Sequence, residues 1–430
     1  MLRLRGEVRA PTRVGIWATV FVLAVAAGDL TLVPLIQLRL ATVVMLGVAL
    51  LAVWSARGTP WLRPAPLALL SFALVAAAWA PLALSRAPDP VEGRAEVQGF
   101  LAGIAVAVAV VALSRCSRIG LVGMRRGWML ALGLSVLVAT YELITKDHLW
   151  LSPGLDWAES HRTIVAGAFR NPNDFAIALT AMISGTLAGA ASRAERRRGW
   201  RRAVPIVLCV LGAIAVLLTE SRSGLLALIV VLAIHLGAAV WNRRRLGVSP
   251  AALAGGGLVA LVGVVAAFTV PALAAHNPVL RTLIAAGEPG TARSDTLRLD
   301  LIRAGWRYLR ESDGLGTGAA SFEVLLARDP NPGVSTHTWL HNSFLEIVLQ
   351  YGVVVGGALG LVLLIALAAV RRRGAVDGSV ARVEVLASIT CFAALAFASA
   401  TVVTAPVWWL ILGQAVASAW WLDQGMPRGA

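Results

Sequence analysis

Residues 341–370 read HNSFLEIVLQYGVVVGGALGLVLLIALAAV. From Phe344 onward the stretch is dominated by apolar residues and is long enough to cross a bilayer, which takes roughly 20 residues in a helix. Its first two residues, His341 and Asn342, are polar and are the last residues of a long polar segment. Placing a histidine and an amide where a membrane begins costs free energy, so residues of this kind are usually functional. This junction is the first candidate for a reactive site.

The rest of the chain repeats the apolar pattern. Of its 430 residues, 58% are hydrophobic and 14% are charged, and the mean hydropathy is +0.76. These values predict an all-α polytopic membrane protein with about twelve transmembrane helices, forming a single integral membrane domain over residues 1–430. The expected spans are 15–27, 38–55, 65–84, 97–113, 128–145, 175–191, 204–219, 224–241, 251–270, 341–370, 383–404 and 405–422.

The charges predict the orientation of these spans. With both termini on the cytoplasmic side, the inside segments collect most of the 38 Lys and Arg residues, and the outside segments collect most of the 23 acids. This is the distribution that the positive-inside rule describes. Topology and anionic lipid account for the high pI of about 11.4, so no nucleic-acid partner is expected. Two outside segments are long, 146–174 and the extracytoplasmic loop 271–340.

The loop 271–340 has the composition of a folded segment. Its middle part, 294–310, places apolar residues near helical spacing and predicts an amphipathic helix over the membrane surface. The sequence GLGTGAASF follows at 314–322. The backbone at Gly316 and Gly318 is able to approach a phosphate or a sugar closely, although a plain turn after a helix explains such glycines equally well.

Three arginines occupy unusual positions on the outside. Arg170 lies in the sequence FRNPND just before a span, Arg222 lies in TESRSG between two spans, and Arg298 lies on the amphipathic helix. Each alone is more often an interface arginine that reaches toward headgroups, or for Arg222 an ion pair with Glu220. Together with a histidine on the same face they favour an anion site, because guanidinium groups bind diphosphate through paired hydrogen bonds. Asn173 is a further candidate for binding the substrate.

His341 is the candidate general base. A lone histidine at a helix start is more often a capping or packing residue, but its ordinary pKa near 6.5 suits proton transfer at neutral pH. His337 ranks second, and His148, His161, His235 and His276 are expected to be structural or solvated. The acids of the long loop are interleaved with arginines, so no metal site and no cofactor are expected.

Several motifs of the chain carry a family resemblance. They are the sequences FRNPN, TESRSG and GLGTG, Arg298, and His341-Asn342 followed after nine residues by Gly352. In this order they resemble the O-antigen ligase/polymerase superfamily of bacterial surface-polysaccharide assembly. The ligase pattern has Gly, Thr or Tyr three residues after that glycine, where this chain has Val355. A polymerase of repeat units, or a ligase for another acceptor, therefore stays open beside ligase proper.

The resemblance implies a GT-C-type glycosyltransferase in the bacterial inner membrane. Its donor would be a glycan on undecaprenyl diphosphate and its acceptor a lipid or glycan hydroxyl, on the extracytoplasmic face. The implied roles are proton acceptor for His341, diphosphate binding for the three arginines, and orientation for Asn342, in an inverting transfer without metal. A transporter or lipid flippase and a non-catalytic scaffold are the alternatives of other classes. Transporters concentrate polar groups near the bilayer midplane, whereas here they gather at one face.

Overall fold

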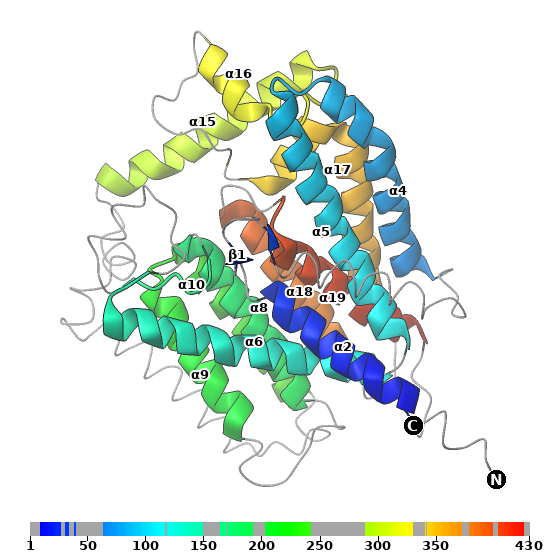
Figure 1. The fold of residues 1–430 in the computed structure, drawn as a ribbon, viewed down its shortest axis with the longest axis vertical. Coiled ribbons are helices and arrows are strands. Elements are labelled where there is room, and N and C mark those ends of the chain that lie inside the picture. Colours follow the sequence, from blue (N-terminus) through cyan, green and yellow to red (C-terminus); the bar gives the residue numbers. More distant parts are fainter. Residues whose placement is uncertain are drawn as a thin grey trace.

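The computed structural model of the chain describes residues 9–26, 31–33, 38–39, 63–116, 118–148, 164–169, 171–191, 203–241, 289–329, 340, 342–371, 378–398 and 403–424. Within these residues the chain is a bundle of helices with one small hairpin of two strands (Figure 1). The helices are α2 (Arg9–Ala26), α4 (Pro64–Ser85), α5 (Pro90–Cys116), α6 (Arg118–Thr145), α8 (Pro172–Ala191), α9 (Ala203–Leu218), α10 (Arg222–Trp241), α15 (Pro289–Glu311), α16 (Phe322–Arg328), α17 (Ser343–Val370), α18 (Gly378–Ala398) and α19 (Pro406–Gln424).

Seven of the described helices are long and apolar enough to cross a membrane, namely α4, α5, α6, α8, α10, α17 and α18. The described parts of α2 and α9 are apolar but shorter. The prediction of a polytopic helical membrane protein is therefore confirmed. The predicted total of twelve spans stays a prediction, because the span expected at 251–270 lies outside the described residues.

One short hairpin lies between the described helices. Strands β1 (Thr31–Val33) and β2 (Leu38–Arg39) pair antiparallel, so the first two residues of the span expected at 38–55 form a strand. The remainder of that span lies outside the described residues. Val33 and Leu38 are apolar and one is β-branched, so an apolar run of this length does not distinguish the start of a strand from the start of a helix.

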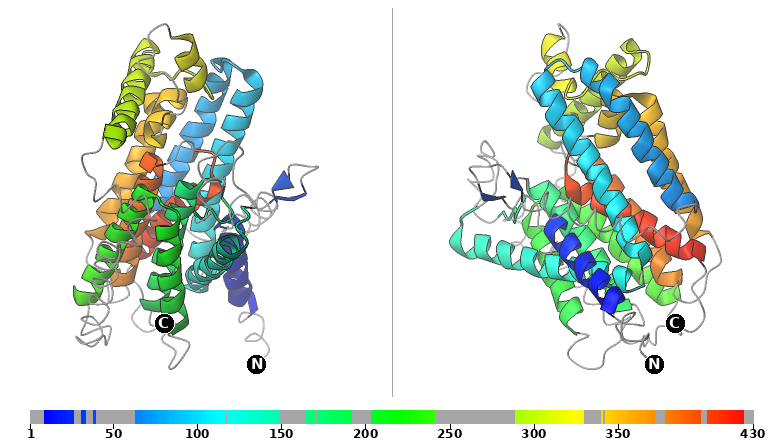
Figure 2. Two further views of the ribbon diagram at one scale, coloured as in Figure 1. Left: turned by 90° about the vertical axis from the view of Figure 1, so that its left-hand side faces the viewer. Right: turned by 45° about the vertical axis from the view of Figure 1, so that its right-hand side comes forward.

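The amphipathic helix expected at 294–310 is confirmed by α15. Its apolar side chains Leu301, Ala304 and Leu309 are buried, at spacings of three and five residues. They pack with residues of α16 and with Leu345 and Leu349 of α17. Figures 1 and 2 show α15 and α16 at one end of the bundle, the end where α17 begins and where α4 passes into α5.

An aromatic cluster joins α4, α5, α17 and α19. Phe100 stacks on Tyr351 with ring centroids 4.3 Å apart, and Phe72 stacks on Trp409 at 5.9 Å. A Cβ at Gly103 would come within 2.0 Å of the Trp409 ring, so glycine is what lets α5 and α19 approach. Close approach at small residues is the usual way in which helices pack inside a bilayer, where the solvent is as apolar as the side chains.

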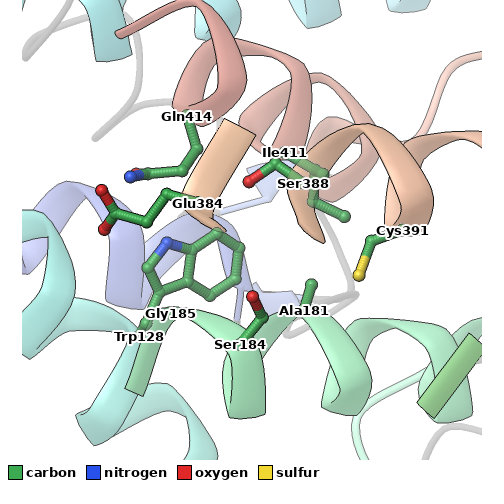
Figure 3. A pocket seen from close by; sticks show the side chains of 9 residues that line it. All are labelled: Trp128, Ala181, Ser184, Gly185, Glu384, Ser388, Cys391, Ile411 and Gln414. Carbon is green, nitrogen blue, oxygen red and sulfur yellow. The ribbon is translucent and has the colours of Figure 1, made fainter. Parts of the chain in front are cut away.

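The helix directions bring several amino-terminal ends to the same side. Gly224 and Ala176 touch, since a Cβ at Gly224 would lie 2.3 Å from the Ala176 Cβ, and further along His235 lies 3.1 Å from the Ser184 hydroxyl. Helices α8 and α10 therefore run parallel, with their amino termini together. Figure 3 shows that α18 runs antiparallel to α8, with Cys391 beside Ala181. The carboxyl end of α18 is thus on the side where α8 begins.

A buried ion pair ties α6 to α18 near the opposite end. Arg125 donates to both carboxylate oxygens of Glu384, at 2.7 and 2.8 Å, and the two side chains are 6% and 2% exposed. The Ser418 hydroxyl of α19 donates to the same carboxylate at 3.1 Å. Because each charge has a partner and the geometry is bidentate, the pair can remain ionised away from water.

A closed cavity of about 10 Å³ adjoins this ion pair (Figure 3). Ser184 and Ser388 point into it from opposite walls, and Gln414 lies above Glu384. The Gln414 side-chain oxygen has no hydrogen-bond partner in the described part of the chain. A volume of this size with several polar groups holds about one water molecule. The cavity is too small for any larger ligand, so it is not a candidate substrate site.

Removal of Arg125 should destabilise the fold strongly. In an Arg125→Met variant the Glu384 carboxylate stays buried without its cation, at a cost of roughly 3–5 kcal/mol. The measurement is the thermal unfolding midpoint of the purified chain in detergent. Arg126→Met, at the exposed neighbouring position, is the matched control. Pairing Arg125→Met with Glu384→Leu should recover most of the loss, and equal midpoints for Arg125→Met and the control would contradict the assignment.

Candidate functional site at the start of α17

Helix α17 consists of two parts separated by a break. Gly352 has a φ of 82° and a ψ of 168°, which lies outside the helical region. The first part, 343–351, is a short helix that begins at Asn342. The Asn342 side-chain oxygen accepts a hydrogen bond from the Leu345 amide at 3.0 Å, as an N-cap residue does. The capping role considered for the histidine at this junction therefore belongs to Asn342, which is 8% exposed.

The glycine-rich segment 314–320 completes the hydrogen bonding at this break. In an unbroken helix the carbonyls of Leu349 and Gln350 would accept from the amides four residues later. Here the Thr317 amide donates to the Leu349 carbonyl at 2.7 Å, and the Gly318 amide donates to the Gln350 carbonyl at 3.2 Å. The Val353 amide, freed by the break, donates to the Gly314 carbonyl at 2.9 Å. The segment 314–320 and the break at Gly352 therefore satisfy each other's backbone hydrogen bonds.

The two glycines singled out from the sequence are needed for close backbone approach. Gly316 has a φ of 96°, and a Cβ there would lie 2.7 Å from the Gln350 carbonyl oxygen. Gly318 has a φ of 105°, and a Cβ there would lie 2.4 Å from the Arg86 carbonyl oxygen. The Arg86 guanidinium donates to the Gly316 carbonyl at 2.8 Å. These contacts fix the loop between α4 and α17, and phosphate binding at the two glycines stays a prediction.

A second polar region lies where α8 and α10 begin side by side. The Asn171 side chain accepts from the Asn173 amide at 2.8 Å, so Asn171 caps α8 and Asn173 occupies its first turn, half-buried. The Ser221 hydroxyl accepts from the Gly224 amide at 3.1 Å, so Ser221 caps α10. Arg222 is therefore the first helical residue of α10. Two helix amino termini placed together present positive dipole ends, which favour an anion, although Asp174 adds a negative charge in the first turn of α8.

A buried carboxylate holds the segment that leads into α8. One Glu142 oxygen accepts from the amides of Ala166 and Gly167, at 2.9 and 2.8 Å. The other oxygen lies 3.4 Å from His148, which forms an ion pair when that histidine is protonated. His148 was expected to be structural or solvated, and its partner is Glu142. No sequence pattern pointed to Glu142, because an acid near a helix end is usually solvated.

Helix α15 contacts Asp329, the residue that follows α16. The Tyr308 hydroxyl donates to the Asp329 carboxylate at 2.6 Å, and the Arg307 guanidinium pairs with the same oxygen. Burial, reinforced by the hydrogen bond to Asp329, raises the pKa of Tyr308. The hydrogen bond to Tyr308 raises the pKa of Arg307. Both groups keep their protons at neutral pH, so this contact holds α15, which contains Arg298, against its neighbours.

The predicted site residues divide into two groups. Asn342, Asn173, Gly316 and Gly318 are placed as described above, and Arg222 and Arg298 are located by the helices that contain them. His341, His337 and Arg170 lie outside the described residues. In the sequence His341 directly precedes the cap Asn342, and Arg170 directly precedes the cap Asn171.

The two polar regions lie at the same end of the bundle. Phe344, in the first turn of α17, packs against Phe397 near the carboxyl end of α18, with ring centroids 5.8 Å apart. Helices α8 and α10 begin on that side as well. Three helix amino termini therefore face one side of the protein, with α15 and α16 beside them (Figure 2). Among the described residues no group of three or more His, Cys, Asp or Glu is arranged to hold a metal ion.

These features define an integral membrane protein of many helices, with polar residues gathered at one end of the bundle. The O-antigen ligase family matches residues 207–360, from α9 to the second part of α17. This match supports the resemblance of the chain to the O-antigen ligase/polymerase superfamily. It supports a membrane protein of polysaccharide biosynthesis that acts on lipid-linked glycans. No curated protein matches the chain.

Gly316→Ala should separate the loop from α17. A residue forced into positive φ costs about 1–3 kcal/mol, and the overlap with the Gln350 carbonyl adds to this. A fall in the thermal unfolding midpoint is therefore expected. Gly360→Ala is the matched control, because that glycine lies in α17 with nothing within 4 Å of an added Cβ. A midpoint for Gly316→Ala at or above that of the control would refute the docking.

Proposed function

We propose that this chain is a membrane glycosyltransferase of the O-antigen ligase type. It transfers a glycan from undecaprenyl diphosphate to an acceptor hydroxyl on the extracytoplasmic face. The observation that carries the proposal is the family match over 207–360, because it contains Arg222, Arg298 and His341 in the order of the motifs. Arg170 lies before the matched region, so its proposed role is based on the FRNPN sequence alone.

The proposed glycosyl transfer requires few protein groups. Diphosphate is already a competent leaving group, so the protein must mainly align the acceptor oxygen with the anomeric carbon and stabilise the charge that grows on the departing phosphate. In our proposal His341 accepts the acceptor proton, and Arg222, Arg170 and Arg298 stabilise the leaving diphosphate. A single displacement of this kind inverts the anomeric centre and uses no metal.

The described backbone is consistent with these roles for the histidine and the arginines. The adjoining amino termini of α8 and α10 supply positive dipole ends for an anion at the helix that begins with Arg222, while Asn173 lies in the first turn of α8. The cap at Asn342 fixes the start of α17, so the residue before it leaves a rigid helix end. Preorganised donors of this sort need no rearrangement at the moment of reaction.

A polymerase of glycan repeat units is the second candidate. It shares the donor and the superfamily, and it differs in using another lipid-linked glycan as acceptor. Val355, which stands where the ligase pattern has Gly, Thr or Tyr, is the specific observation that favours it. Reconstitution with a lipid-linked oligosaccharide separates the two, because a ligase caps each acceptor once and a polymerase lengthens the chain.

Replacement of His341 by Ala should abolish glycan transfer while the protein still inserts into the membrane. General base catalysis contributes about 10²- to 10⁴-fold, so kcat should fall by at least 10²-fold. The assay follows product formation from a lipid-diphosphate-linked glycan in proteoliposomes. His276→Ala is the control, since that histidine is expected to have no chemical role. Wild-type turnover by the His341→Ala variant would remove the histidine from the mechanism.

Replacement of Arg222 by Lys should keep the charge and lose the paired hydrogen bonds to the diphosphate. Arg and Lys are not interchangeable at a bidentate site, so a fall of about tenfold or more in kcat/KM is expected. Arg303→Lys is the matched control, because Arg303 is exposed on α15 and pairs with Asp300. Equal kcat/KM values for the two variants would exclude Arg222 from the diphosphate site.

A further inference from the structure

The Glu142 carboxylate links α6 to the segment that leads into α8. Glu142 lies in the last turn of the apolar helix α6, and its side chain is fully buried. One of its oxygens accepts from the Ala166 amide at 2.9 Å and from the Gly167 amide at 2.8 Å. Hydrogen bonds from backbone amides to a carboxylate are among the strong ones. An acid buried in a membrane-spanning helix is costly, so a residue of this kind usually serves a function.

The segment held by Glu142 is a tight turn that packs against the first turn of α8. The Phe169 amide donates to the Ala166 carbonyl at 3.2 Å, which closes the turn. Gly167 has a φ of 60°, and a Cβ there would lie 2.5 Å from the Phe175 ring. The Phe169 and Phe175 rings also pack together, with centroids 5.6 Å apart. Any displacement of this turn therefore moves the start of α8.

The same turn is bonded to the connection between α9 and α10. The Val165 amide, next to the two amides that Glu142 binds, donates to the Leu218 carbonyl at 3.2 Å. Leu218 is the last residue of α9, and Ser221, the cap of α10, follows three residues later. The Ser221 amide donates to the Thr219 hydroxyl at 3.3 Å, which makes this connection compact. Glu142 is thus joined, through one turn, to the starts of both α8 and α10.

The Glu142 carboxylate has no direct access to a substrate. The oxygen that binds the turn is occupied by two amides. The other oxygen is shielded from solvent and lies 3.4 Å from the Nδ1 atom of His148. Because neither oxygen can reach a reacting group, the carboxylate can act only through the backbone that it holds. That backbone leads into the helix ends where the diphosphate is proposed to bind.

We propose that Glu142 is a positioning residue for the lipid-diphosphate donor. This inference rests on the proposed function, in which the diphosphate binds where α10 begins with Arg222. By holding the turn 164–169, Glu142 keeps the starts of α8 and α10 together. Without the carboxylate, two amides of the turn lose their hydrogen-bond acceptor, and the turn no longer fixes the two helix ends. Binding of the donor then weakens, whereas binding of the acceptor substrate does not depend on this turn.

The kinetic experiment compares Glu142→Ala and Glu142→Gln with the wild-type chain in proteoliposomes containing a lipid-diphosphate-linked glycan. A misplacement of about 1 Å in a site can cost about 10²-fold, so the KM for the donor should rise about tenfold or more in Glu142→Ala. The KM for the acceptor substrate should stay within about twofold. The glutamine side-chain oxygen can accept from both amides, so Glu142→Gln should keep the donor KM within about threefold of wild type. Asp147→Asn, which removes an exposed carboxylate just beyond α6, is the matched control.

A binding measurement with undecaprenyl diphosphate that carries no glycan separates this inference from the proposed function. Glu142→Ala should bind this lipid about tenfold more weakly than the wild type does. Amide hydrogen exchange should be faster at 164–169 and 218–224 in that variant alone, because the turn opens locally. If the lipid binds with this dependence on Glu142 and the wild-type chain transfers no glycan, the proposed function is refuted and the positioning role is supported.

Several results would overturn the positioning role. A purely structural residue would lower the unfolding midpoint and kcat together and leave both KM values unchanged. Equal affinities of Glu142→Ala and the wild type for undecaprenyl diphosphate, or unchanged exchange at 164–169, would also contradict it. So would a Glu142→Gln variant as impaired as Glu142→Ala, or a wild-type chain that does not bind the lipid.

Discussion

The break in α17 at Gly352 is the constraint on which this end of the bundle depends. A continuous helix would satisfy its own carbonyls, and the segment 314–320 would then have nothing to bind. Because Gly352 adopts a positive φ, the carbonyls of Leu349 and Gln350 accept from that segment instead. A Cβ at Gly352 would lie 2.7 Å from the Leu315 carbonyl oxygen, so only glycine allows the exchange. Helix α17 and the segment 314–320 therefore position each other.

The hydrogen bonds between the segment 314–320 and α17 also determine what this segment can do chemically. The amides of Thr317 and Gly318, which the sequence pattern suggested for an anion, are used in holding α17. The positive dipole ends that suit an anion lie elsewhere, at the starts of α8 and α10, where Asn171 and Ser221 form the caps. A glycine-rich sequence thus contributes rigidity at one helix, while ordinary helix amino termini supply the groups suited to a phosphate.

Much of the fold could be predicted from the sequence, because a bilayer imposes a simple length and composition on each helix. The amphipathic spacing of Leu301, Ala304 and Leu309 likewise predicted α15 correctly. The sequence did not reveal Glu142 or the Arg125–Glu384 pair, since their partners lie far away in the chain. Local pattern describes a helix face, and it carries no information on which distant acid or amide will meet that face. The convergence of Arg170, Arg222 and His341 stays a prediction.

The buried ion pair of Arg125 and Glu384 serves the structure of the bundle and not its chemistry. Arg125 and Glu384 neutralise each other with bidentate geometry, and the cavity beside them has room for about one water molecule. Neither group needs to change its charge there, so the pair holds α6 and α18 together.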